Sequence, residues 1–544
     1  MSRKLAMYDV RGIQDYIYKT AKVQDAIGAS AIVEDIILEA LKDAVEKEEL
    51  SYDLEWYDEN GVLLYDVSKA SDTDVQVLYI GGGNAFVSFQ DEDICQRVNH
   101  RMSRYVLEKT YSLQLAIAVT DQTKNYAKDY KNIFDEMVRV KANMEVSKPF
   151  GALPVMDVEI KTGLPACLVE KKDGDKAIGT SRETYLKKAK EDQVRDLIQR
   201  AKIFDNYVES KGVDSTLAVV HIDGNNMGLR IRKLIDGIED YGKAVNKMRE
   251  ISYCINHSYK SVYEQMENHF NGYAGKGDGK KKQYNVLKIL TAGDDITYVC
   301  KGKYALSTVE YFCREIGKKS MNGGENEKDI NLYGFSVCAG VAYIGSHFPF
   351  SVGYEVAEAC CDSAKDMAKK PENMFHFERE IKNDDGTTTM EKNHKIGNWV
   401  DFQICKNIHT GDLDKTRKLE YVTSHNEKLL IRPYELPLLN LKSREGAINR
   451  YENLKNNIWY FQNDKNIPHS HAKKLRNLYS SGQEVVNEFA AFLASRGWKM
   501  PDGTVNMYTE DNQALWYDAL ELFDSFEVVD NEKIQKEETG HGDL

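Results

Sequence analysis

The stretch LKILTAGDDITYVCKG, residues 287–302, contains two apolar segments separated by a short polar turn. Both segments are rich in β-branched and aromatic residues, so the stretch predicts a β-hairpin with Gly293, Asp294 and Asp295 at its tip. Glycine and aspartate are ordinary turn residues because they tolerate the backbone conformations of tight turns. The turn alone therefore explains them, and the alternative is a divalent-metal site completed by a third carboxylate.

A third carboxylate occurs in TLAVVHIDGNNMG, residues 216–228. Asp223 ends an apolar strand and is followed by a short polar turn, Gly224, Asn225 and Asn226, whose small side chains leave the backbone open to a cation or a nucleotide. In a ferredoxin-like sheet the first strand lies beside the hairpin strands, so Asp223 is expected to face the hairpin carboxylates.

Three carboxylates at one sheet edge repel each other unless a cation lies among them, and hard oxygen ligands favour Mg²⁺ or Mn²⁺. Two such ions can activate an attacking hydroxyl and stabilise a pyrophosphate leaving group. We therefore expect nucleotidyl transfer, in which a 3′- or 2′-hydroxyl attacks the α-phosphate of a nucleoside triphosphate. Asp223, Asp294 and Asp295 are the predicted metal ligands and catalytic residues, and Gly293 is a candidate for nucleotide binding.

The predicted elements follow the order strand, helix, hairpin, helix and strand, which is the βαββαβ order of a ferredoxin-like domain, and this order occurs twice. A repeat of this length indicates duplicated domains. We predict an α+β protein with a first palm (nucleotide cyclase-like) domain at residues 1–155, a polar helical connector at 156–205 and a second, catalytic palm at 206–437. A C-terminal helical domain with a disordered tail is expected at 438–544.

The first copy lacks the hairpin carboxylates, because its turn reads Gly81-Gly82-Gly83-Asn84. This hairpin is not expected to bind two metal ions. Glycine lets a ligand approach the backbone closely, so Gly82, Gly83 and Asn84 are candidates for nucleotide binding. A purely structural role explains the same residues equally well.

Lys365 and Lys369 lie one helical turn apart in DSAKDMAKK, within the helix predicted after the last strand of the second copy. Either lysine could reach the triphosphate of a bound nucleotide. An exposed amphipathic helix explains both lysines as well. Both are therefore candidate nucleotide-binding residues with a structural alternative.

The composition narrows the class of protein. A formal charge of −13 over 544 residues argues against a chain that coats nucleic acid by itself, so nucleic acid would be held by a partner or by a local groove. Nine cysteines are scattered without a C-x-x-C pair, and no zinc site is predicted. The chain has no apolar run of membrane-spanning length and no signal-peptide pattern, so a cytoplasmic location is expected.

Several motifs, in this order, resemble the Cas10 family, the large subunits of type III CRISPR effectors (Cmr2 and Csm1). They are DVRGIQDYIY and IGASAIVEDI near the start, YIGGGNAFVSF in the first palm, HIDGNNMG and TAGDDITYV in the second, and then CAGVAYIGSHFPFSVGYEVAEACCDSAKDMAK, WVDFQI and LLIRPYELP. Ala292 replaces the first glycine of the family's Gly-Gly-Asp-Asp turn and leaves both carboxylates in place.

The resemblance implies that the second palm condenses ATP into cyclic oligoadenylates, second messengers in antiviral defence. It implies two Mg²⁺ or Mn²⁺ ions on the three aspartates, Lys365 near the triphosphate, and other type III CRISPR subunits, crRNA and target RNA as partners. Many family members also carry an HD nuclease domain and a zinc-binding cysteine cluster. Here no His-Asp doublet occurs and only Cys167 stands in the connector, so neither DNA cleavage nor zinc is expected.

Two alternatives stay open at this point. The chain can be a catalytically silent structural large subunit of an RNA-guided complex, or a stand-alone cyclic-nucleotide synthase similar to GGDEF proteins or class III cyclases. Two fused palms and a long helical C-terminus weigh against the stand-alone synthase. The identity of the product, its ring size and its linkage do not follow from the sequence.

Overall fold

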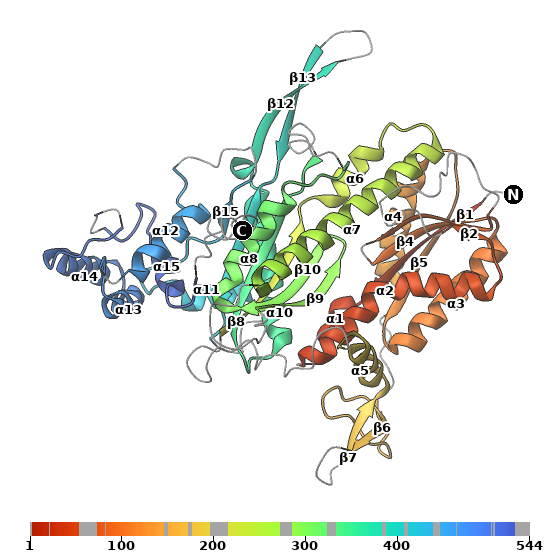
Figure 1. Ribbon diagram of the computed structural model, residues 1–544, viewed down its shortest axis with the longest axis horizontal. Helices are drawn as coiled ribbons and strands as arrows, with labels where there is room; N and C mark the ends of the chain where they lie inside the picture. The colour runs from red at the N-terminus through yellow and green to blue at the C-terminus, as the bar shows by residue number, and fades with distance from the viewer. Residues whose placement is uncertain are drawn as a thin grey trace, which may run out of the picture.

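The structure is a computed structural model, drawn as a ribbon in Figure 1. It describes residues 3–20, 22–53, 73–81, 83–145, 151–171, 177–195, 216–272, 285–323, 333–382, 388–406, 412–438, 446–463, 465–501, 503 and 506–527. Gly82 and the predicted disordered tail lie outside these ranges. None of the helices within them combines the length and the apolar composition needed to cross a bilayer.

The first palm is built on a five-stranded sheet with the order β2-β3-β4-β1-β5. Its elements are β1 (Lys4–Arg11), α1 (Ile13–Tyr18), α2 (Val23–Lys47), β2 (Tyr52–Asp53), β3 (Val75–Gly81), β4 (Asn84–Phe89), α3 (Glu92–Thr110), β5 (Gln114–Asp121) and α4 (Tyr126–Asn143). The strand β1 pairs antiparallel with both β4 and β5. This is the strand order of a ferredoxin-like sheet, so the predicted fold of this domain is confirmed.

The second palm repeats this order in a six-stranded sheet, β15-β14-β11-β8-β10-β9. Its elements are β8 (Thr216–Gly224), α6 (Met227–Ile235), α7 (Tyr241–Gly272), β9 (Val286–Ala292), β10 (Asp295–Lys301), α8 (Ala305–Ile316), β11 (Val337–Gly345), α10 (Phe350–Ala368), β14 (Asn398–Ile404) and β15 (Tyr434–Leu436). A separate hairpin of β12 (Phe375–Lys382) and β13 (Thr388–Lys395) projects from this domain (Figure 1). The predicted α+β fold class is confirmed for both copies.

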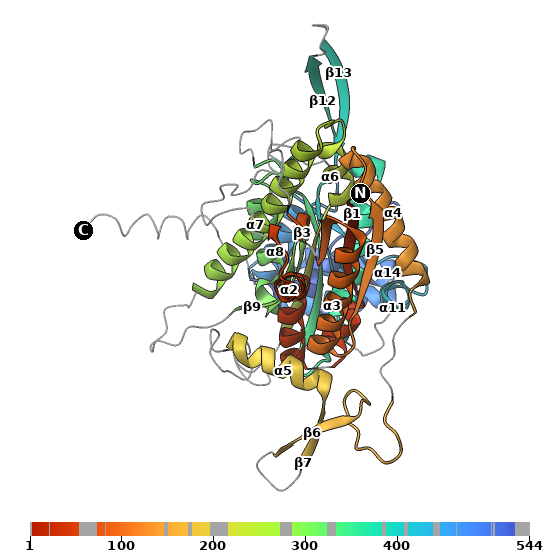
Figure 2. The same cartoon turned by 90° about the vertical axis from the view of Figure 1, so that its right-hand side faces the viewer.

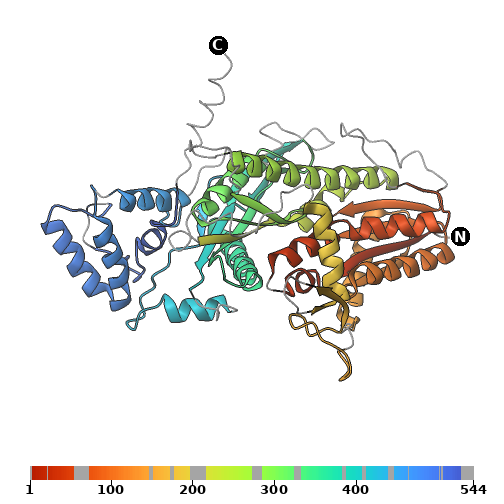
Figure 3. The ribbon, with the colours of Figure 1, turned by 60° about the horizontal axis from the view of Figure 1, so that its bottom comes forward.

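The helix α7 packs against both palms, and Figure 3 shows it running across them as the long yellow-green helix. Arg249 of α7 lies 2.8 Å from the carboxylate of Asp53 in the first palm. The Ser252 hydroxyl donates a hydrogen bond of 2.7 Å to the carbonyl of Ile80, at the end of β3. These contacts fix the β3–β4 hairpin of the first palm close to the β9–β10 hairpin of the second.

The connector differs from the sequence prediction. Its helix α5 (Arg182–Arg195) was expected, but the preceding residues form a two-stranded sheet of β6 (Ala166–Lys171) and β7 (Ala177–Ser181). Figure 2 shows this sheet as an arm that projects from the body of the molecule. Charged residues dominate this segment and suggested helices, whereas the short strand pattern was too brief to be recognised.

The helical C-terminal domain is confirmed. Its helices are α12 (Tyr451–Gln462), α13 (His469–Leu478), α14 (Gln483–Ser495) and α15 (Tyr517–Leu522), and α11 (Leu413–Glu420) precedes them. Figure 1 shows α12 to α15 at the end of the molecule away from the first palm. The first palm and the C-terminal domain therefore contact the second palm from different sides.

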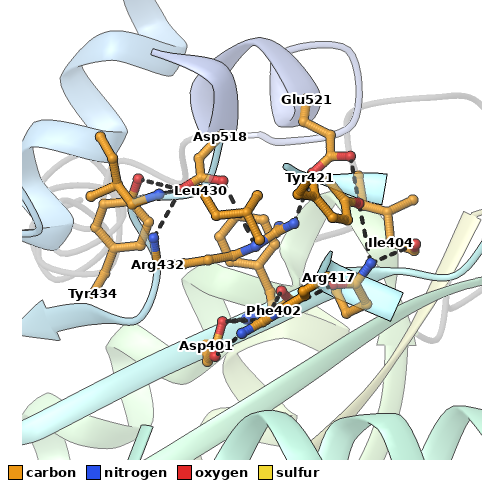
Figure 4. Close-up of polar contacts among 12 residues, drawn as sticks. Asp401, Phe402, Ile404, Arg417, Tyr421, Leu430, Arg432, Tyr434, Asp518 and Glu521 are labelled. Carbon is orange, nitrogen blue, oxygen red and sulfur yellow. Dashed lines mark hydrogen bonds and ion pairs between the residues drawn. The ribbon is translucent and has the colours of Figure 1, made fainter. Parts of the chain in front are cut away.

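A buried network of charged side chains joins the C-terminal domain to the second palm (Figure 4). Arg417 of α11 donates two hydrogen bonds of 2.8 Å to Asp401 on β14. Arg432 donates to Glu521 on α15 at 3.2 Å, and its backbone N–H donates to Asp518 at 3.0 Å. Buried charges are tolerated when they are paired and hydrogen-bonded, so the network favours one orientation of α15 against the sheet.

Candidate active site

The β9–β10 hairpin forms the tight turn expected from the sequence. Ala292 pairs with Asp295, which leaves Gly293 and Asp294 as the two turn residues. Gly293 has a φ of 65°, in the left-handed region that favours glycine. The turn therefore requires Gly293 and presents two consecutive carboxylates at the sheet edge.

The strand β8 brings the third carboxylate to the same edge. Ile222 pairs with Ile296 of β10, so Asp223 stands one residue further along, at the level of the hairpin turn. A Cβ atom on the next residue, Gly224, would lie 2.7 Å from an oxygen of Asp294. Glycine at this position therefore permits the close approach of the Asp294 carboxylate to β8.

A cavity of about 490 Å³ opens at this edge, between the two palms. Asp223, Asp294 and Asp295 line it, and so do Gly83 and Asn84 of the first-palm hairpin. The structure thus brings together two sets of candidate residues that lie about two hundred positions apart in the chain.

The cavity also contains residues that the sequence did not single out. The helix α7 contributes Asn256 and Lys260, and α2 contributes Glu34. Apolar side chains, among them Ile37 of α2 and Leu290 of β9, form another part of the wall. Asn256 and Lys260 belong to an ordinary amphipathic helix, so no motif marks them, and packing between the palms places them at the site.

The hairpin carboxylates have unusual protonation properties. Burial, and then the nearby charge of Asp223, raises the pKa of both Asp294 and Asp295 to about 7. The Nδ1 atom of His221 lies 3.4 Å from the Oδ1 atom of Asp295, and burial lowers the pKa of this histidine. The imidazole is therefore neutral near pH 7 and does not neutralise the carboxylates.

Lys365 contacts the carboxylate of Asp223 directly. Burial opposes its charge, but the carboxylate of Asp223 outweighs this effect, so the pKa of Lys365 is raised. The lysine lies on α10, which packs tightly on β11. A Cβ atom on Gly340 of β11 would lie only 1.8 Å from the carbonyl oxygen of Ala357 on α10. Lys365 therefore places a positive charge at the edge of the acidic site.

The other candidate residues have different surroundings. The buried side-chain amide of Asn225 donates hydrogen bonds to Ser336 and to the Gly397 carbonyl, which anchors the turn after β8. Asn226 has a φ of 53° and precedes α6. Lys369 is exposed just beyond the end of α10. Nucleotide binding by these three residues stays a prediction.

The donor atoms of the site suit a hard divalent cation. All three acidic side chains offer carboxylate oxygens, and within the described chain the buried Oδ1 atom of Asp295 accepts no hydrogen bond. The side chains are not assembled as a metal cage, because among the described residues no three acidic, histidine or cysteine side chains are close enough to hold an ion. The ammonium group of Lys365 lies beside the carboxylate of Asp223, so one predicted metal ligand is paired with a lysine in this structure.

The first palm contains a partial counterpart of this site. Asp9, near the end of β1, pairs with Asn84 of its hairpin, and the Nζ atom of Lys141 on α4 lies 2.5 Å from Asp9. This arrangement parallels the contact of Lys365 with Asp223. A comparison of YDVRG with HIDGN could have revealed the strand-terminal aspartate of the first palm.

A second cavity, of about 610 Å³, lies between α1 and α10. Tyr18 and Tyr354 line it and stack with their ring centroids 3.8 Å apart. Burial, and then the charge of Asp295, raises the pKa of Tyr18. The influence of Asp295 on Tyr18 indicates that the acidic site lies close to this second cavity as well.

The fold and the site define an α+β protein of two fused palm domains with an acidic cavity between them. Its sequence matches no family model and no curated protein. Among solved structures it is similar to Csm1 in T. onnurineus, with a TM-score of 0.46, and to the Csm1–Csm4 cassette in complex with pppApA (0.46) or with cA4 (0.42). In each case the identity is 13%, and the alignment covers 96% of this chain and 69% of the other.

Proposed function

We propose that the second palm is a nucleotidyltransferase that converts ATP into cyclic oligoadenylates through 3′–5′ phosphodiester bonds. The observation that carries the proposal is the meeting of Asp223, Asp294 and Asp295 at one edge of the cavity between the palms. Partly buried carboxylates that lie close enough to raise each other's pKa are unfavourable without a cation. We place this activity in type III CRISPR defence, with other effector subunits, crRNA and target RNA as partners.

The three aspartates would hold two Mg²⁺ or Mn²⁺ ions. When bound, such ions activate the attacking hydroxyl and neutralise charge on the triphosphate. Lys365 supplies a further positive charge beside Asp223, where it can stabilise the leaving pyrophosphate. His221 stays neutral and lies against Asp295, so it limits the movement of this carboxylate without competing as a cation.

Condensation of two nucleotides requires room for a donor and an acceptor. The cavity of about 490 Å³ has an apolar wall suited to a nucleobase, and it exposes Gly83 and Asn84 of the first palm. The cavity of about 610 Å³ is lined by Tyr18 and Tyr354, whose rings stack on each other. We assign one nucleotide to each cavity, with the first palm as a binding half that holds no metal in its hairpin.

A structural role is the second candidate. The contact between Lys365 and Asp223 satisfies one carboxylate without any ion, and it favours a chain that has kept the palms as a scaffold. In that case the complex would assemble but form no adenylate product.

Product analysis by mass spectrometry separates the two candidates. The purified protein, with co-purifying partners and target RNA, is incubated with ATP and Mg²⁺ or Mn²⁺, beside the Asp294→Asn/Asp295→Asn variant. We expect cyclic adenylates from the wild type and at least a hundredfold less from the variant, since charge stabilisation by a single group contributes about that factor. Absence of product and of metal-dependent ATP binding in the wild type would favour the scaffold.

A further inference from the structure

One segment of the C-terminal domain, residues 465–499, carries a net positive charge that contrasts with the acidic chain as a whole. Residues 465–499 contain six lysine and arginine residues and two glutamates, whereas the whole chain has a net charge of −13. Lys474 on α13 and Arg496 just after α14 are exposed, and neither forms an ion pair within the described residues. Their charges are therefore available to an anionic partner.

Two neighbouring aromatic rings lie between these two cations. The Nζ atom of Lys474 lies 4.8 Å from the ring centroid of Phe489. Phe489 stacks on Phe492, with centroids 5.9 Å apart and an interplanar angle of 19°. The guanidinium carbon of Arg496 lies 5.5 Å from the centroid of Phe492. We call these four residues the α13–α14 face.

Phe492 is the exposed ring of the α13–α14 face. Phe489 is nearly buried at 9% exposure and anchors the row, whereas Phe492 is 45% exposed and presents its ring to solvent. His471 extends the row, because its ring lies 4.9 Å from that of Trp498. The exposed ring of Phe492 offers a stacking surface, and the cations at the two ends of the row can bind phosphates.

We propose that the α13–α14 face binds single-stranded RNA. Single-stranded nucleic acid is held by cations that contact the phosphates and by aromatic rings on which bases stack, and this face combines the two. An acidic protein surface would match the cations but would not require a row of aromatic rings. The proposal is independent of the nucleotidyltransferase activity, because the face belongs to the C-terminal domain.

The test measures, by fluorescence anisotropy, how tightly a fluorescein-labelled single-stranded RNA binds to the full-length protein. Phe492→Ala should weaken binding about tenfold, because one stacked base is lost, and Phe492→Trp should restore it. Lys474→Gln/Arg496→Gln should weaken binding and reduce the salt dependence by about one to two released counterions. Glu488→Gln, one helical turn before Phe492, should strengthen binding because it removes a negative charge.

The matched control is Lys128→Gln/Lys131→Gln, which removes two exposed charges from α4 in the first palm. It should bind RNA like the wild type, and circular dichroism should show that every variant is folded. The proposal is overturned if the wild type does not bind RNA, or if the α4 variant loses as much affinity as the variants of the α13–α14 face. It is also overturned if Phe492→Ala abolishes the binding of an acidic peptide but leaves the binding of RNA unchanged.

Discussion

Asp294 and Asp295 have an ordinary pKa of 3.8 and a pKa of about 7 in the folded protein, because the site is buried and acidic. The folded chain therefore holds these two protons more tightly than the unfolded chain. The linkage relation then predicts a stabilising contribution that is fully present below about pH 4 and lost as the pH rises through about 7. Urea unfolding in EDTA over this range measures it.

Asp294→Asn/Asp295→Asn is the control for that measurement. Asparagine does not titrate, so the variant should lack this part of the pH dependence and should be more stable than the wild type above pH 7. Mn²⁺ should raise the unfolding free energy of the wild type at that pH and leave the variant unchanged. Equal pH profiles for the two proteins would contradict the burial of these carboxylates.

The candidate residues differ in how far the sequence could identify them. Asp223, Asp294 and Asp295 were recognisable because each interrupts or ends an apolar strand, which is a local signal. Lys260 and Asn256 were not, because they lie on an amphipathic helix whose orientation toward the first palm depends on contacts far away in the chain. Asp9 was not predictable in the same way, because the hairpin of the first palm has no carboxylate with which it could form a site.

At the scale of the element, α10 positions Lys365 through its contact with β11. Gly340→Ala would place a methyl group 1.8 Å from the Ala357 carbonyl oxygen, so the helix must move away from the strand. We expect a loss of stability of about 1–3 kcal/mol and a fall in nucleotide affinity, because overpacking shifts backbone. Thermal unfolding and ATP titration measure the two effects.

Gly345→Ala is the matched control on the same strand. Gly345 ends β11 and is exposed, and a Cβ atom there would meet nothing within 4 Å. The change in stability should stay within about 0.5 kcal/mol. If the two alanine variants were equally stable, tight packing of α10 on Gly340 would be ruled out.

The elements themselves show where local patterns suffice. The helix α2 was predictable because Ile32, Val33, Ile36 and Leu41 recur at helical spacing, and all four are buried. The sheet of β6 and β7 was missed because short strands in a charged segment carry little periodicity. The ferredoxin-like strand order was predictable because its hairpins and crossovers follow from the order of elements along the chain.

At the scale of the whole molecule, the buried network of Figure 4 holds the C-terminal domain on the second palm. Asp518 is almost fully buried and accepts hydrogen bonds from the backbone of Ile431 and Arg432. Asp518→Asn should lower the unfolding free energy by up to about 3–5 kcal/mol, because it removes one of the two carboxylates, Asp518 and Glu521, that compensate the buried charge of Arg432. Urea unfolding measures this loss.

Asp524→Asn tests the same chemistry at the surface. Asp524 lies 3.2 Å from Lys473, and their side chains are 35% and 50% exposed. Exposed pairs contribute little, so this variant should differ from the wild type by less than about 1 kcal/mol. Similar losses for the two asparagine variants would mean that the buried network does not hold the domains together.

The sequence by itself determined the duplication of the palm, the turn residues of the β9–β10 hairpin and the identity of the three aspartates. These features depend on periodicity and on turn chemistry, which act over a few neighbouring residues. The tertiary structure decided that Lys365 contacts Asp223, that the glycine hairpin of the first palm shares a cavity with the aspartates, and that α13 and α14 form one face. Those contacts join segments far apart in the chain, so they depend on how helices and sheets pack against each other, which local patterns do not encode.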